Sequence, residues 1–286
     1  MENRHTQDML HAILGDRGIV VVAGDDAKSF LQGLVTNDVA GLVPGQAAYA
    51  ALLSAQGKIL ADFLVTEAEA EKGGGLYLDC PLSLAGDLVK RLTVYKLRAR
   101  ITIADASARL RVGAAWGAGG EAWRPDDAVA VFRDPRDGAL GWRCIGAFDA
   151  ANEASAAERY EAHRIGLGVP KGGADFAYGE TFPHDANLDL LHGVDFKKGC
   201  FVGQEVVSRV EHRGTARKRI VRVHFAGPPP APGTAIVAGD TEIGTFGSAT
   251  AGTGLAMIRT DRAEEAVSAH VPLIAGGVEL ALAPAG

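Results

Sequence analysis

The sequence predicts an α+β fold, with a mixed body over residues 1–215 and a small antiparallel β-barrel over 216–286. In the first 215 residues, short apolar runs alternate irregularly with apolar stripes at helical spacing. This mixture is typical of antiparallel strands with packed helices. After the proline-rich stretch 228–233 come five short apolar stretches separated by glycines. Their even spacing is typical of a small barrel.

Each element of the body has its own signal. A strand over 18–23 ends at Gly24-Asp25-Asp26, where an aspartate can cap the next helix. Apolar residues at helical spacing then predict one helix around residues 30–34 and another around 84–92. The capping-box pattern Ser155 to Glu158 predicts the start of a third helix. Further body strands are expected at 49–53, 59–66, 76–78, 128–132 and 140–147, and barrel strands at 220–225, 235–237, 242–246, 255–258, 271–274 and 278–282. Residues 113–120 are rich in glycine and have no clear period, so we expect them to be irregular.

Composition narrows the classes of function. The 286 residues carry 29 basic and 35 acidic side chains, a net charge of −6, which does not favour nucleic acid or anionic lipid. No apolar run reaches the ~18 residues of a membrane span, and the start lacks the apolar core of a secretory signal. Three widely separated cysteines argue against a disulfide framework, so we expect the reducing cytoplasm.

The same residues limit metal chemistry. An iron–sulfur cluster usually takes four thiolates, and this chain has three scattered cysteines. The eight histidines show no zinc-binding spacing. The sequence therefore predicts no resident metal, and a role with clusters would need ligands from a partner protein.

The stretch Lys198-Gly199-Cys200-Phe201-Val202-Gly203-Gln204-Glu205 is the most specific motif of the chain. It predicts a glycine-bearing loop that enters a helix at its N-terminus. A helix N-terminus and neighbouring lysines favour a thiolate, so Cys200 reads as a reactive or ligand-capable sulfur. The alternative is a buried cysteine that acts as a small hydrophobe.

This motif resembles the K-G-C-[FY]-x-G-Q-E signature of the YgfZ-type folate-binding proteins. That family includes mitochondrial factors for iron–sulfur cluster maturation and is related to the T-protein of the glycine cleavage system. The resemblance extends through 30–38, 160–170 and 182–188, and a basic run at 217–219 also fits. It implies a T-protein-like body, a C-terminal barrel, and tetrahydrofolate or another reduced folate as the ligand.

Asp62 is the first candidate to contact the folate. It lies in an apolar strand, and a buried carboxylate must be paired or have its pKa raised. The alternative is a place on the solvent face of a half-buried strand. In T-proteins a similar G-x-x-x-D segment carries an acid beside the folate, which implies that Asp62 bonds the pterin or moves a proton there.

The resemblance also implies the rest of the site. Cys200 and Asp62 are the residues expected to carry chemistry. Residues expected to hold the folate are Asp62, Asn37, Trp142, Arg143, Arg164, Lys198 and Gln204. Trp142 can stack on a flat pterin, although a core tryptophan is the alternative. The glutamate segment of the T-proteins is not found, which disfavours aminomethyl transfer.

A basic zone follows the cysteine motif. It contains Arg209, Arg213, Arg217, Lys218, Arg219 and Arg222. Such a run can be a solvated surface, or it can bind a folate tail or an acidic partner. Nucleic acid ranks last because aromatic side chains are not interleaved with the charges.

The leading hypothesis is a folate-binding accessory protein for iron–sulfur cluster assembly or repair, with assembly or client proteins as partners. The alternative is a folate-dependent one-carbon transferase or demethylase. A third hypothesis is a thiol-based redox enzyme. We could identify no site for an amine substrate, so both enzyme hypotheses rank below that of an accessory protein.

Overall fold

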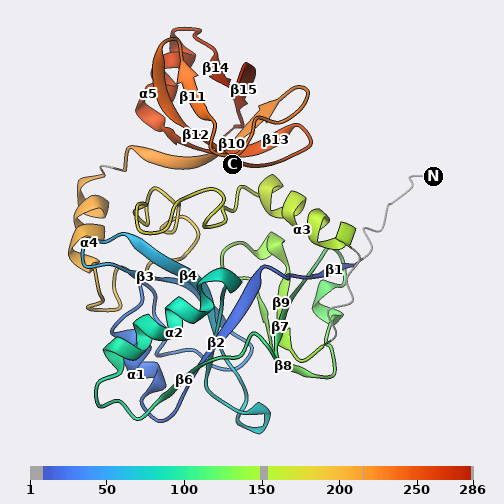
Figure 1. Cartoon of the computed structure of the whole chain (residues 1–286), viewed down its shortest axis with the longest axis vertical. Helices are drawn as coiled ribbons and strands as arrows, with labels where there is room; N and C mark the ends of the chain where they lie inside the picture. The colour runs from blue at the N-terminus through green and yellow to red at the C-terminus, as the bar shows by residue number, and fades with distance from the viewer. Residues whose placement is uncertain (1–8, 149–153, 215, 285–286) are drawn as a thin grey trace. The chain divides into compact units, whose positions relative to one another are not determined.

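The computed structural model describes residues 9–148, 154–214 and 216–284 (Figure 1). The chain divides into two compact units. The first is made from the described residues of Met1–Leu52, Ala61–Tyr160 and His192–Val202. The second is made from those of Leu53–Leu60, Glu161–Leu191 and Gly203–Gly286. This division groups three stretches of the predicted body, within 53–60, 161–191 and 203–215, with the barrel, and a domain boundary at residue 215 stays a prediction.

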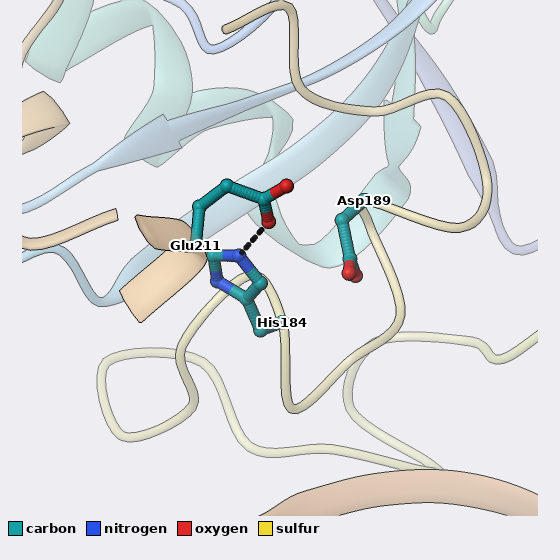
Figure 2. Close-up of side chains that lie close together, drawn as sticks. All are labelled: His184, Asp189 and Glu211. Atoms are coloured by element: carbon teal, nitrogen blue, oxygen red, sulfur yellow. Dashed lines mark hydrogen bonds and ion pairs between the residues drawn. The ribbon is translucent and has the colours of Figure 1, made fainter. Parts of the chain in front are cut away.

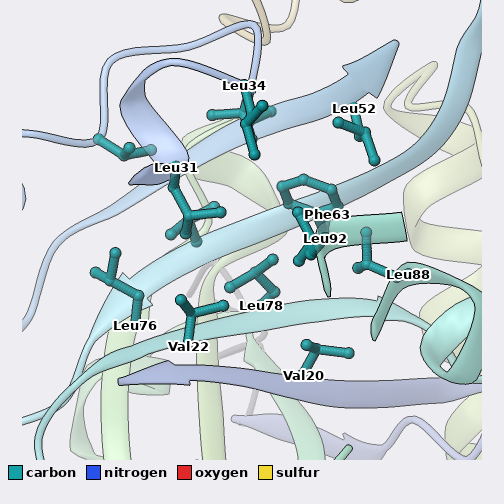
Figure 3. Close-up of a cluster of buried hydrophobic side chains, with 14 of the residues drawn as sticks. Val20, Val22, Leu31, Leu34, Leu52, Phe63, Leu76, Leu78, Leu88 and Leu92 are labelled. Carbon is teal, nitrogen blue, oxygen red and sulfur yellow. The ribbon is translucent and has the colours of Figure 1, made fainter. Parts of the chain in front are cut away.

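A five-stranded sheet forms one half of the first unit. Its strand order is β3 (Ala47–Leu53), β4 (Ile59–Glu67), β5 (Leu76–Pro81), β2 (Arg17–Ala23) and β6 (Thr102–Asp105). The helices of this half are α1 (Ala27–Gln32) and α2 (Leu82–Lys96). The stripe Ala85, Leu88 and Leu92 of α2 is buried. These side chains join a cluster around the fully buried Phe63 (Figure 3). Pro81 occupies the N-cap position of α2.

A four-stranded antiparallel sheet completes the first unit. Its order is β1 (Leu10–Ile13), β7 (Arg111–Trp116), β9 (Trp142–Gly146) and β8 (Ala128–Arg133). β7 lies partly in the stretch that we predicted to be irregular. Five of its six residues are buried, so the alternation that marks a strand is missing. Gly113 is required there because the ring of Trp123 lies where a Cβ would be.

Two further helices outside the barrel are α3 (Ala154–Gly166) and α4 (Gln204–Arg213), and short 3₁₀ helices cover Ala70–Lys72, Gly120–Ala122 and Gly138–Leu140. α3 already includes Ala154, so Ser155 is not its N-cap as predicted, and residues 149–153 lie outside the described residues. Asp26 occupies the N-cap of α1, but its carboxylate accepts the backbone N–H of Arg100 at 2.7 Å rather than capping that helix.

The barrel of the second unit is closed, as predicted. Its strand order is β10 (Lys218–Phe225), β13 (Thr253–Arg259), β12 (Thr241–Thr250), β11 (Ala235–Ala238), β14 (Leu273–Ala275) and β15 (Val278–Leu282), and β10 pairs with both β13 and β15. Phe246 and Ile236 are among its buried residues. The barrel also carries α5 (Thr260–Ser268), which we did not predict because its buried residues are two alanines.

Candidate functional site

Asp62 lies in the interior of the first unit. Its residue is 5% exposed, which excludes a place on the solvent face of β4. The phenol of Tyr49, on β3, donates a hydrogen bond of 2.9 Å to Oδ2 of Asp62. Burial, followed by the charge of Asp62, raises the pKa of Tyr49 well above its ordinary value, so the phenol stays a donor. The carboxylate is thus held in a fixed place by a neutral group.

Asn37 connects this pair to the chain segment that carries the cysteine. Its Nδ2 donates to the carbonyl of Tyr49 at 2.7 Å and to the carbonyl of His192 at 2.6 Å. Its Oδ1 accepts the N–H of Asp38 at 2.8 Å. The side chain that we expected to hold a folate therefore holds three backbone segments together.

Lys198 fastens the cysteine loop to the same region. Its Nζ donates to the carbonyls of Gln32 and Val35, both at 2.6 Å. Burial lowers the pKa of Lys198 to about 8, although Asp38 and Asp195 raise it. The ammonium thus serves as an anchor two residues before Cys200.

A second pair of contacts fixes the start of that loop. The hydroxyl of Thr36 donates to the carbonyl of Gly193 at 2.6 Å, and the carbonyl of Thr36 accepts the N–H of Asp195 at 3.0 Å. With the lysine anchor, the loop is attached along 32–37. Asp62 and the cysteine loop therefore share one scaffold through Tyr49 and Asn37.

Cys200 differs from the other two cysteines in its surroundings. It is exposed, whereas Cys80 and Cys144 are both 0% exposed. Burial raises the pKa of Cys80 and of Cys144 to about 12, so neither is a thiolate near neutral pH. Among the three thiols, Cys200 is the one that can react with or bind a group in solution.

Arg143 is the centre of a buried ion network. Its Nε donates to Oδ2 of Asp134 at 3.1 Å, and its Nη1 donates to Oδ2 of Asp79 at the same distance. Its Nη2 donates to the phenol of Tyr160 at 2.9 Å. All three nitrogens have partners within the protein, so Arg143 shapes the interior of the unit.

Two further arginines extend the network towards Asp62. Arg136 binds both oxygens of Asp134, and its guanidinium lies 5.7 Å from the ring centre of Tyr49. Arg17 binds Asp79. Burial would lower the pKa of Arg17, but Asp79 and then Asp62 raise it above its ordinary value. Three arginines therefore face three aspartates.

Three other predicted residues stand apart from this network. Trp142 is half-buried, and the guanidinium of Arg124 lies 4.7 Å from its ring centre. Arg164 belongs to the second unit, where it donates to Glu161 and Asp175. Gln204, the first residue of α4, belongs to the second unit too.

The basic zone also divides into parts with different environments. Arg219 donates to both oxygens of Asp189 at 2.6 and 2.8 Å, and Arg222 donates to the carbonyl of Gly166 at 2.7 Å. The exposed members are Arg209, Arg213, Arg217 and Lys218. The run is therefore not one uniform patch.

His184, Asp189 and Glu211 come close together in the second unit (Figure 2). Their ligand atoms lie within 4.8 Å of one another, and Nε2 of His184 is 3.0 Å from a carboxylate oxygen of Glu211. Because Arg219 takes both oxygens of Asp189, that carboxylate is already neutralised. The group links the segment before residue 190 to α4.

Sequence reasoning did not identify Tyr49, Arg17, Asp79, Asp134 or Arg136. Asp79 carries the same signal as Asp62, because it is a carboxylate in an apolar strand. Tyr49 lies in an equally apolar strand and has no distinguishing pattern. Arg136 pairs with Asp134 only two residues away, but its approach to the ring of Tyr49 joins two sheets, which no local pattern reports.

Comparisons with known proteins identify relatives of this chain. A model described as the GCVT N-terminal domain matches residues 16–73, the range that holds Asn37, Tyr49 and Asp62. A model described as the CAF17 C-terminal β-barrel domain matches residues 217–285. The iron–sulfur cluster assembly factor IBA57, mitochondrial, of Homo sapiens is 33% identical over 275 residues, covering 87% of this chain and 77% of the human protein.

The chain belongs to the IBA57 family of iron–sulfur cluster assembly factors. The Mus musculus relative is 32% identical over 276 residues, with the same coverage. The IBA57 homologue of Mycosarcoma maydis is 38% identical over 231 residues, and the match spans 75% of this chain and 57% of that protein. The predicted link to cluster assembly is thus supported at the level of the family.

A solved structure supports the fold assignment for this IBA57-family chain. The glycine cleavage system aminomethyltransferase T of Bartonella henselae is similar with a TM-score of 0.73 and 18% identity, over 97% of this chain and 86% of that one. The T-protein-like body and the C-terminal barrel are confirmed. The narrower YgfZ-type assignment stays a prediction.

The predicted cytoplasmic location is wrong by these comparisons, because the IBA57 relatives are named as mitochondrial proteins. Spread, unpaired cysteines indicate a reducing environment but do not identify the compartment. In the described part of the chain, no helix is long and apolar enough to cross a membrane.

Proposed function

We propose that this chain is a tetrahydrofolate-binding accessory protein in iron–sulfur cluster assembly or repair, and that Cys200 is its functional thiol. Membership of the IBA57 family supports the assembly role. The single observation that carries the rest is the shared scaffold of Asp62 and the cysteine loop. A ligand at Asp62 and a group at Cys200 would act on connected segments.

The donor set around Asp62 fits a reduced folate. A pterin presents N–H groups, and a carboxylate accepts hydrogen bonds from them in an interior where each bond counts for more. Tyr49 orients the carboxylate, and the arginine network supplies a fixed positive surrounding. Asp62 would then bind and orient the pterin, and Asn37 would keep the wall of the site in place. Trp142 and Arg143 remain proposed parts of this site in the first unit. Folate contacts of Arg164 and Gln204, which belong to the second unit, stay separate predictions.

The thiol count defines how Cys200 would take part in assembly. A cluster usually needs four thiolates, and two of the three thiols here are buried. Cys200 would therefore contribute one ligand to a cluster whose other ligands come from an assembly or client protein. The anchored position of Lys198 keeps this ligand in a defined place.

Calorimetry with tetrahydrofolate tests the folate part. We expect a dissociation constant in the micromolar range, about −8 kcal/mol. Asp62→Asn should weaken binding at least tenfold, whereas the exposed control Asp240→Asn should leave it unchanged. Absence of heat at protein concentrations well above that range would rule out the folate proposal, and equal affinity of Asp62→Asn would remove Asp62 from the site.

The aminomethyltransferase-like fold favours one second candidate, a folate-dependent one-carbon transferase. A turnover assay separates the two. An accessory protein leaves tetrahydrofolate unchanged, and we expect this result with methylated amines as co-substrates. Catalytic formation of methylene-tetrahydrofolate would establish the transferase instead.

A further inference from the structure

The C-terminal end of α2 exposes apolar side chains to solvent. The helix lies beside the five-stranded sheet (Figure 1), and its stripe Ala85, Leu88 and Leu92 is buried. Beyond that stripe, Val94 is 75% exposed, Tyr95 is 41% exposed and Leu97, just after the helix, is 89% exposed. Single exposed apolar residues are ordinary, but three within four positions form a patch, and such patches mark interaction sites.

The backbone at Leu97 has an unusual conformation. Its φ is 44° and its ψ is −107°, and a leucine rarely adopts a positive φ. Disfavoured backbone of this kind clusters at functional positions. The burial of Leu88 and Leu92 in the preceding turns shows that α2 has a complete inner face without Leu97. Packing of the fold therefore does not account for the patch.

Basic side chains surround the patch. Residues 90–100 contain five basic residues and no acidic one, in a chain with a net charge of −6. Arg91 pairs with Asp87, and Arg100 lies near Asp25 and Asp26. Within the described part of the chain, the other three form no ion pair. These are Lys90, Lys96 and Arg98.

Helix geometry places the charges beside the apolar residues. Lys90 lies one turn before Val94, and Arg91 lies one turn before Tyr95. A basic residue at a helix C-terminus is stabilising in itself, which explains Lys96 but not the exposed apolar side chains. The combination has the composition of an interface, with an apolar centre and a charged rim.

We propose that Val94, Tyr95, Leu97, Lys90, Lys96 and Arg98, which we call the α2 surface, form a docking site for an acidic protein that presents apolar side chains among its carboxylates. Charge complementarity selects this partner. Stable attachment to anionic lipid takes a larger basic cluster than three unpaired side chains. A symmetric contact between two copies would place like charges against each other.

Crosslinking in cells, followed by binding measurements, tests this proposal. The full chain carries p-benzoylphenylalanine in place of Val94, and the control carries it in place of Val267, which is 56% exposed on α5. We expect a protein adduct from the first position that the second does not give. The captured protein is then purified and its affinity for the chain is measured.

We expect Tyr95→Ser with Leu97→Ser, and separately Lys90→Glu with Arg98→Glu, to weaken that affinity at least tenfold while thermal melting changes little. The matched charge control, Arg109→Glu with Arg159→Glu, changes two exposed arginines outside the α2 surface and should leave it unchanged. Binding should also weaken between 50 and 300 mM salt.

The following results would overturn the proposal. They are no adduct from the Val94 position, an adduct with a second copy of the chain, an adduct with lipid or nucleic acid, or a captured protein that binds both double variants as tightly as the parent.

Discussion

The phenol of Tyr49 donates to the buried carboxylate of Asp62 at 2.9 Å, and this bond fixes the acid that we propose as a folate ligand. Tyr49→Phe keeps the ring and removes the donor. A bond to a charged group contributes about 1.5–3 kcal/mol, so we expect a loss of this size in urea unfolding. Tyr95→Phe, at an exposed tyrosine, should cost less than about 0.5 kcal/mol. Equal stability of the two variants would show that the bond does not hold Asp62.

Ionisation of the buried carboxylate of Asp134 should make the free energy of unfolding depend on pH. Burial would raise its pKa, but Arg136 and then Arg143 lower it from 3.8 to about 2. Because the folded pKa is depressed, this stabilisation is complete above the ordinary pKa and is lost as the pH falls from about 4 to 2. Asp134→Asn should cost about 3–5 kcal/mol at pH 7, because it leaves buried arginines underpaired.

The difference between the parent and Asp134→Asn in the free energy of unfolding should then shrink by about 2 kcal/mol between pH 5 and pH 2. Asp126→Asn, at an exposed site, serves as the control and should track the parent throughout. A difference that stays constant over this range would mean that Asp134 is not ionised in the folded protein.

The thiols should react in a fixed order. Cys200 is exposed, while Cys80 and Cys144 are buried with pKa values raised to about 12. Iodoacetamide at pH 7.5, read out by peptide mass spectrometry, should therefore alkylate Cys200 at least tenfold faster than either of the others in the native protein. In urea the three rates should converge. Labelling of Cys80 at the rate of Cys200 without denaturant would contradict the burial described here.

Gly203 precedes α4 at a position where a side chain does not fit. Its φ is 80°, and a Cβ there would lie 2.7 Å from the carbonyl oxygen of Ser54. Gly203→Ala should therefore destabilise the protein by about 2 kcal/mol or more. Gly199→Ala is the matched control, since its φ is 99° but no atom lies within 4 Å. Equal losses of stability in the two variants would show that the positive φ alone causes the destabilisation, and that the close approach to Ser54 adds nothing to it.

The sequence was sufficient for elements whose signal is local. The barrel strands and helix α2, with Leu88 and Leu92 buried, follow from periodicity, and burial of Asp62 was one of two interpretations that its apolar strand allowed. β7 was missed because it is buried on both faces, and α5 because it buries only alanines. Asp62 and Asp79 find their partners on other strands, so the sequence could not assign them.

In the site, too, the sequence predicted local features but not the contacts between distant segments. Exposure of Cys200 was expected from its glycines and lysines, and the structure agrees. Asn37 and Lys198 were expected to face a ligand, and their side chains form hydrogen bonds with backbone groups of the protein. A motif shows that a residue matters, but a polar side chain that supports the site gives the same signal as one that touches the ligand.

Replacement of Cys200 by serine tests the central claim most directly. The measurement is the activity of iron–sulfur enzymes in a strain that lacks this chain, after return of the parent or of Cys200→Ser. An exposed loop thiol should contribute no more than about 0.5 kcal/mol to stability, so the variant should accumulate and melt like the parent. We predict that the parent restores the enzyme activities and that Cys200→Ser does not. Full restoration by a folded Cys200→Ser protein would contradict the claim that this thiol carries the function.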